Sequence, residues 1–246
     1  RRTGLGDDAP GGAKFQGASK VVHPMLIEAT VDFSSRAMKE LWPAGGPAKS
    51  YVPGDPTEER LEKAERKARM LNWQLTVQCQ NARAEIEQLL TQLPLGGSQY
   101  LKLWWDEERG RPEFLFVPID DMYLPFAATN FYTAQRRTHV QYLTQLEYDR
   151  RVSSGMYRDV DLPLPGMEPE QSGASRANDK IEGREATAYN EDGLRAIYES
   201  YVTAEVDGVT APFIVSVDVT TRTVLSVYRN WAEDDDSREE LQWFVE

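Results

Sequence analysis

Two stretches of the chain repeat apolar residues every three or four positions, as amphipathic helices do. The first covers about residues 24–42, where Pro24 suits a first helical turn and Pro43 ends the run. The second covers about residues 57–93 and follows Asp55, which we expect to cap it, with Glu58 three positions later. An unbroken helix of that length would extend about 55 Å, so we expect it either to break or to act as a strut in a larger assembly.

Beyond Pro94 the apolar period changes from helical spacing to two, which predicts strands. We expect a β-hairpin over about residues 99–118 and a further strand over about 136–143. Thr144 with Glu147 forms a second capping-box pattern and predicts a short helix that ends before Gly155.

The remaining pattern divides the chain into four parts. Residues 1–21 are rich in glycine and predict a flexible arm, while 22–162 form an α+β region. Residues 163–193 show no periodicity and predict a surface insertion or linker. Three strand-like runs within 194–246 predict an antiparallel meander. The predicted class is therefore α+β, with long amphipathic helices and antiparallel hairpins.

Composition excludes several classes of protein. The 246 residues carry 28 bases and 40 acids, a net charge of −12, which argues against general nucleic-acid binding. Most of the excess acid lies in 163–193 and 232–246. A single cysteine, Cys79, and two histidines cannot supply a disulfide or the usual zinc ligands. No run of 18 apolar residues predicts a membrane span.

The sequence offers little chemistry to an enzyme. It has no phosphate-binding glycine loop, nucleophile elbow or zinc-protease motif, so we expect no catalytic residue, cofactor or metal. The strongest alternative is a Mg²⁺ site for phosphoryl hydrolysis built from aspartates, although solvated or turn-capping carboxylates are the commoner case. Those aspartates are Asp120, Asp121, Asp159 and Asp161. Cys79 lies on an apolar helical stripe and His139 on a strand, which favours structural roles for both.

Aromatic and basic side chains suggest a subunit interface instead. Trp104 and Trp105 occupy opposite faces of one predicted strand, so a domain that covers one face leaves the other for a partner. Trp243 and Phe244 end the chain in a strand-like run without a partner, and we expect a further part of the polypeptide to cover them. The neighbouring Arg136 and Arg137 suit either an interface or ion pairs with nearby acids.

Seven blocks of the sequence, in order, resemble the large portal proteins of tailed, podovirus-like bacteriophages. The blocks are 19–24 (SKVVHP), 37–43 (AMKELWP), 70–75 (MLNWQL), 93–98 (LPLGGS), 116–121 (FVPIDD), 155–160 (GMYRDV) and 224–231 (VLSVYRNW). None of the blocks is a catalytic motif, and the resemblance rests on their number and on their order along the chain.

The resemblance implies a ring, usually of about twelve subunits, at one capsid vertex. Double-stranded DNA passes through such a ring without sequence-specific binding during packaging and ejection, and a separate terminase supplies the energy. The chain would be the N-terminal wing portion, followed by stem and clip parts that meet the terminase and the tail adaptor. The expected location is the virion, with the capsid protein as a further partner. Alternatives are another head-to-tail adaptor or scaffold protein and the metal-dependent phosphoryl hydrolase.

Overall fold

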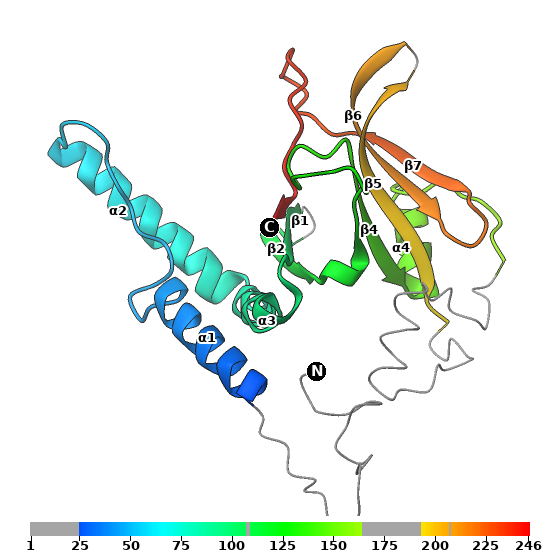
Figure 1. Ribbon diagram of the computed structural model, residues 1–246. Helices are drawn as coiled ribbons and strands as arrows, with labels where there is room; N and C mark the ends of the chain where they lie inside the picture. Colours follow the sequence, from blue (N-terminus) through cyan, green and yellow to red (C-terminus); the bar gives the residue numbers. More distant parts are fainter. Residues whose placement is uncertain (1–24, 107–108, 164–192, 207) are drawn as a thin grey trace, which may run out of the picture. The chain divides into compact units, whose positions relative to one another are not determined.

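The computed structural model describes residues 25–106, 109–163, 193–206 and 208–246 (Figure 1). The fold class is α+β, as the sequence predicts. The described chain forms two compact units, one of residues 25–119 with 242–246 and the other of 120–241. The predicted arm and nearly all of the predicted insertion at 163–193 lie outside the described residues.

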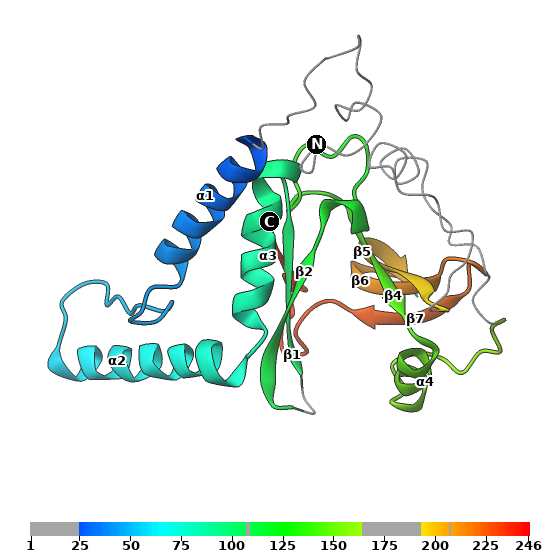
Figure 2. The same cartoon turned by 90° about the horizontal axis from the view of Figure 1, so that it is seen from below.

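Three helices open the first unit. α1 (Met25–Leu41) ends before Pro43, as predicted, and α2 (Glu58–Trp73) passes into a π-helical turn, η1 (Gln74–Gln78). α3 (Ala82–Gly96) then begins in a new direction, which Figure 2 shows. None of the helices in the described ranges is long and apolar enough to cross a membrane.

The prediction of one helix over 57–93 is wrong, because the helical conformation is interrupted at residues 79–81. Cys79 leaves the helical conformation at φ −97° and ψ 77°, and its N–H closes the π turn on the carbonyl of Gln74 at 2.7 Å. The predicted cap is also wrong, since Thr57 rather than Asp55 precedes the first turn of α2 and makes no side-chain cap. Of the two expectations for the overlong pattern, the structure shows the break.

The predicted hairpin is confirmed. β1 (Tyr100–Asp106) pairs antiparallel with β2 (Arg111–Val117), and the two-residue β8 (Phe244–Val245) adds to the other edge of β1. α3 packs against this sheet, and its first turns cover the outer edge of β2. A small core forms between the helices and the sheet from Cys79, Ala82, Leu101 and Phe114.

Side chains around the start of α3 satisfy the backbone of the β2 edge. Asn81 Nδ2 donates to the carbonyl of Phe114 at 2.8 Å, and a carboxylate oxygen of Glu85 accepts the N–H of Phe116 at 2.7 Å. The buried thiol of Cys79 donates to the carbonyl of Pro112 at 3.1 Å. Burial raises the pKa of this thiol, which fits the small buried side chain that the sequence predicts. The helix therefore protects an edge that would otherwise be open to pairing.

The second unit is a five-stranded antiparallel sheet in the order β3-β4-β5-β6-β7. Its strands are β3 (Met122–Tyr123), β4 (Arg136–Leu143), β5 (Arg195–Val206), β6 (Val209–Asp218) and β7 (Val224–Arg229). The predicted strand and the predicted meander are both present. However, β4 pairs with β5 along its whole length, so the strand grouped with residues 22–162 belongs to the meander's sheet.

One short helix packs on this sheet. α4 (Gln145–Ser153) begins with the predicted capping box, in which Thr144 and Glu147 exchange hydrogen bonds between side chain and backbone. Tyr148 from α4 and Tyr157 just beyond it join Ile197 and Leu225 in the core of the unit. The local sequence therefore predicts where this helix begins, while the burial of its side chains depends on strands far away in the chain.

Candidate subunit interface

The two adjacent tryptophans of β1 lie in different surroundings. Trp104 is half-buried, and the ammonium of Lys102 lies 5.9 Å from the centre of its ring. Trp105 faces the other way, opposite Pro112 of β2, and 56% of its surface is exposed. An indole left this open on a strand is an apolar contact available to another molecule.

The expectation that Trp243 and Phe244 have no partner strand and need cover from a further part of the polypeptide is wrong. β8 pairs with β1, Phe244 is only 5% exposed, and Lys102 places its ammonium 5.8 Å from the Phe244 ring. The carbonyl of Trp243 accepts the N–H of Leu103 at 2.8 Å, and its side chain is half-buried. The chain itself supplies the partner strand, because the edge of β1 opposite β2 is free to pair. Trp243 and Phe244 therefore belong to the sheet of their own unit.

Arg136 and Arg137 begin β4 with side chains on opposite faces of the sheet. Arg136 is exposed, whereas Arg137 is 4% exposed and forms an ion pair with Glu240. The guanidinium of Arg137 also lies 5.6 Å from the ring of Phe131. The expected ion pair is thus confirmed for Arg137. Of the two arginines, only Arg136 is exposed and could contact another subunit.

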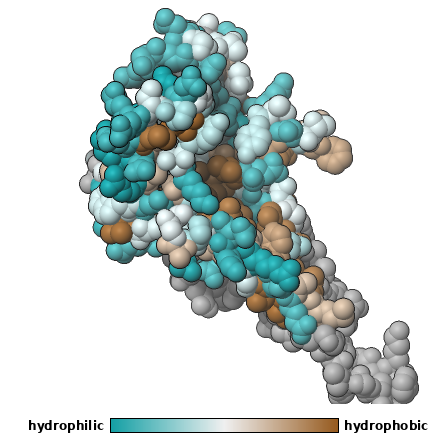
Figure 3. Space-filling model, turned by 90° about the vertical axis from the view of Figure 1, so that its left-hand side faces the viewer, coloured by the Kyte–Doolittle hydropathy of each residue, from teal (hydrophilic) through white to brown (hydrophobic). Residues whose placement is uncertain are grey.

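A larger exposed apolar surface lies on the helices of the first unit, where the sequence pattern predicts packing. α1 buries only Thr30, and α2 buries none of its residues. Apolar side chains there remain open to solvent, and brown areas on this side of the molecule in Figure 3 mark hydrophobic surface. On α1 the exposed apolar residues are Met25, Leu26, Val31, Phe33 and Leu41, and on α2 and η1 they are Leu61, Met70, Leu71, Trp73 and Val77. Helical spacing identified the apolar faces of these helices but did not indicate that their side chains are exposed to solvent.

Polar groups are also buried in the second unit. Arg195 and Asp218 form a fully buried ion pair at 3.1 Å, and His139 Nδ1 lies 3.6 Å from a carboxylate oxygen of Glu199. The phenol of Tyr201 donates to Glu199 at 3.0 Å, and burial followed by the Glu199 charge raises the pKa of Tyr201 strongly. Arg195 bonds to Asp218 and Tyr201 to Glu199, and His139 is buried in the sheet beside Glu199, which favours the structural role predicted for His139.

The four aspartates of the hydrolase alternative do not form a metal site. Asp120 and Asp121 lie in a single 3₁₀ turn, η2 (Ile119–Asp121), while Asp159 and Asp161 line an open hollow of about 420 Å³ beside α4. Burial raises the pKa of Asp121, with the His139 charge acting in the opposite direction. Across the part of the chain that the structure describes, no three His, Cys, Asp or Glu side chains are placed to hold a metal ion.

Neither of two sequence comparisons identifies a relative of this chain. No protein-family model matches the sequence, and a search of curated proteins finds no match. The evidence on function is therefore the sequence pattern and the surface described above.

Proposed function

We propose that this chain is a structural, ring-forming subunit of a tailed-bacteriophage portal and works without a cofactor or catalytic residue. The observation that carries the proposal is the exposure of α1 and α2, which bury a single residue between them in the part of the chain that the structure describes. Apolar surface of this extent on a folded chain is typical of a protein that assembles with others. The seven ordered sequence blocks, which resemble portal proteins, favour a portal ring as the assembly. The exposed Trp105 supplies a second candidate contact between subunits.

In this role the chain binds other copies of itself, and the ring contacts the capsid protein, the terminase and the tail adaptor in the virion. Double-stranded DNA passes through the ring without being recognised by sequence. The net charge of −12 suits such a passage, because a basic surface would bind the phosphates and hold the DNA in place.

The second candidate is another head-to-tail adaptor or scaffold protein, which would use the same uncovered helices to assemble. Imaging the assembly separates a scaffold protein from a portal, since only a protein on the path of the DNA, such as a portal or an adaptor, requires a closed ring around a channel.

The hydrolase alternative has a simple test. Mg²⁺ or Mn²⁺ bound to the folded state alone would raise the melting temperature, by mass action. We expect no shift with either ion and no release of phosphate from a phosphomonoester. A shift that Asp120→Asn or Asp159→Asn removes would restore this alternative.

The proposal itself is tested by the native mass of the purified 28.0 kDa chain over a range of concentrations. We expect one discrete multiple of the chain mass. A mass that stays at one chain throughout would contradict the proposal.

A further inference from the structure

One face of α2 and η1 combines apolar side chains in a row. Met70, Trp73 and Val77 are spaced by three and four positions, which places them on the same side of the helix. Their exposed fractions are 51%, 48% and 56%. We call these three side chains the α2 patch. A partner that covers it would remove a tryptophan and two other apolar side chains from water.

The charge around the α2 patch is positive. Residues 66–73 contain Arg66, Lys67 and Arg69 and no acid. Arg66 is 3.9 Å from Glu62, a loose surface pair, while Lys67 and Arg69 form no ion pair with any residue in the described ranges. A surface that is both apolar and cationic is complemented by one that is anionic and carries an apolar side chain.

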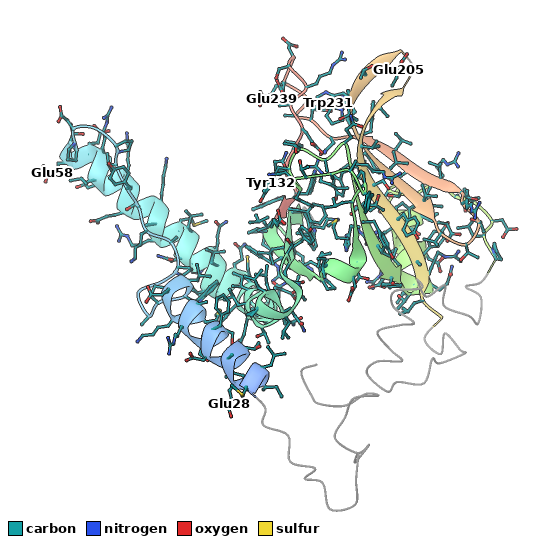
Figure 4. The ribbon with its side chains drawn as sticks, in the orientation of Figure 1. Glu28, Glu58, Tyr132, Glu205, Trp231 and Glu239 are labelled. Carbon is teal, nitrogen blue, oxygen red and sulfur yellow. The ribbon has the colours of Figure 1, made fainter. Side chains whose placement is uncertain are left out.

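This chain contains a segment of that kind at residues 232–241, which we call the acidic segment. It has six acids and one base, and it ends in Leu241, which is 43% exposed. Glu233 and Glu240 are paired with arginines of their own unit. The acids that face solvent without an arginine partner are Asp234, Asp236 and Glu239, and Figure 4 labels the last of them. The one base, Arg238, is also exposed and lies 5.9 Å from the ring of Trp231 in its own unit.

The acidic segment has a defined shape. Asp235 accepts hydrogen bonds from the backbone and hydroxyl of Ser237 at 2.9 and 2.6 Å and from the N–H of Glu239 at 2.8 Å. These bonds, that of the Ser237 hydroxyl first, lower the pKa of Asp235 below its ordinary value. A segment held by such bonds loses less conformational entropy on binding than a free loop does.

We infer that the acidic segment of one copy docks on the α2 patch of the next copy. Three acids, Asp234, Asp236 and Glu239, would face three bases, and Leu241 would add apolar contact beside Trp73. The contact joins two different surfaces, so its head-to-tail repetition gives a ring or a filament. The inference rests on the self-assembling subunit proposed above and names its contact surfaces.

Charge reversal tests the docking on the full chain. One variant carries R66E/K67E/R69E and the other D234K/D236K/E239K, leaving Asp235 to hold the turn. Each alone places like charges across the contact and should weaken self-association by about tenfold or more, because such juxtapositions are strongly unfavourable. An equimolar mixture of the two restores opposite charges at every contact and should assemble again.

Matched controls change the net charge by the same amount at exposed positions elsewhere. K49E/R83E/R150E serves for the first variant and D55K/E87K/E205K for the second, all at positions outside α1, α2 and the acidic segment. Both controls should assemble as the unmodified chain does, and far-UV circular dichroism of all four variants should retain its helical signal. Sedimentation velocity at several concentrations gives the association.

The outcomes separate the two proposals. If the unmodified chain assembles and both reversed variants assemble equally well, the docking is wrong while the self-assembling subunit stands. The docking is also wrong if each variant fails and the mixture does not recover. An unmodified chain that stays monomeric at every concentration contradicts both.

Discussion

Arg195 and Asp218 place a guanidinium and a carboxylate 3.1 Å apart at the centre of the second unit, with 2% and 0% of their side chains exposed. The guanidinium lies 4.9 Å from the ring of Tyr148 and also donates to the carbonyl of Pro163 at 2.8 Å. Asp218 accepts from the backbone and hydroxyl of Thr221. The pair thus joins β5 to β6, α4 and the turn before β7.

Removing one charge of this pair should destabilise the second unit strongly. Asp218→Asn leaves Arg195 charged and buried without its counter-ion, at a cost of about 3–5 kcal/mol in the free energy of unfolding. Replacing both, as R195M/D218L, should cost less than the single change because no charge stays buried. Urea unfolding with hydrogen exchange of the β5 and β6 amides measures this. A loss below about 1 kcal/mol, the scale of an exposed pair, would contradict it.

Acidification should destabilise the first unit through Glu113. Burial raises the pKa of this carboxyl, but hydrogen bonds from Arg111 and Arg109 and their charges more than offset it, so the pKa lies below its ordinary value of 4.5. A depressed pKa stabilises the fold above the unfolded-state pKa, and this stability is lost as the pH falls through the folded value. Thermal unfolding between pH 6 and pH 3, compared with Glu113→Gln, should show a smaller decline for the variant. Equal declines would rule out this role.

The bonds that protect the edge of β2 make a third prediction. Asn81→Ala removes the donor to the Phe114 carbonyl and should cost about 1–3 kcal/mol, the penalty for leaving a buried polar group unpaired. Gln80→Ala, at the exposed neighbouring position, is the control and should change stability by less than about 0.5 kcal/mol. If the two variants unfold at the same urea concentration, the edge bond contributes nothing.

Trp105 should matter to assembly beyond its effect on the stability of the monomer. Because 56% of its surface is exposed, Trp105→Ala should lower the free energy of unfolding by about 2 kcal/mol at most, from the part of the ring that its own unit covers. At the centre of an interface the same change costs about 2 kcal/mol or more, a weakening of self-association by more than tenfold. Phe126→Ala removes a fully exposed aromatic ring in the other unit and serves as the control. Equal association of the two variants would remove Trp105 from the interface.

Local patterns predicted the elements whose signals are local. The hairpin of β1 and β2, the strand β4 and the capping box at Thr144 all lie where the period and the capping residues place them. The break at Cys79 had no such signal, because the apolar spacing continues through it from Leu75 to Ile86 without glycine or proline. What stabilises the break is tertiary, namely the bonds that Cys79, Asn81 and Glu85 make to β2.

The partner of a strand and the burial of its side chains depend on distant parts of the chain. An apolar period of two predicts a strand but not which strand pairs with it. β4 pairs with β5 across about fifty residues, and β8 pairs with β1 across more than a hundred. Phe244 was therefore expected to need cover from a further part of the polypeptide, whereas pairing of β8 with β1 buries it. Trp73 shows the reverse, since helical spacing favoured packing, yet 48% of its surface stays exposed.

The most direct test of the central claim is electron microscopy of the purified chain combined with its native mass. The account predicts a closed ring of about twelve subunits around a central hole, built from repeated contacts between unlike surfaces. Monomers or simple dimers across concentrations and salts would contradict it and would return attention to the aspartates at 120, 121, 159 and 161.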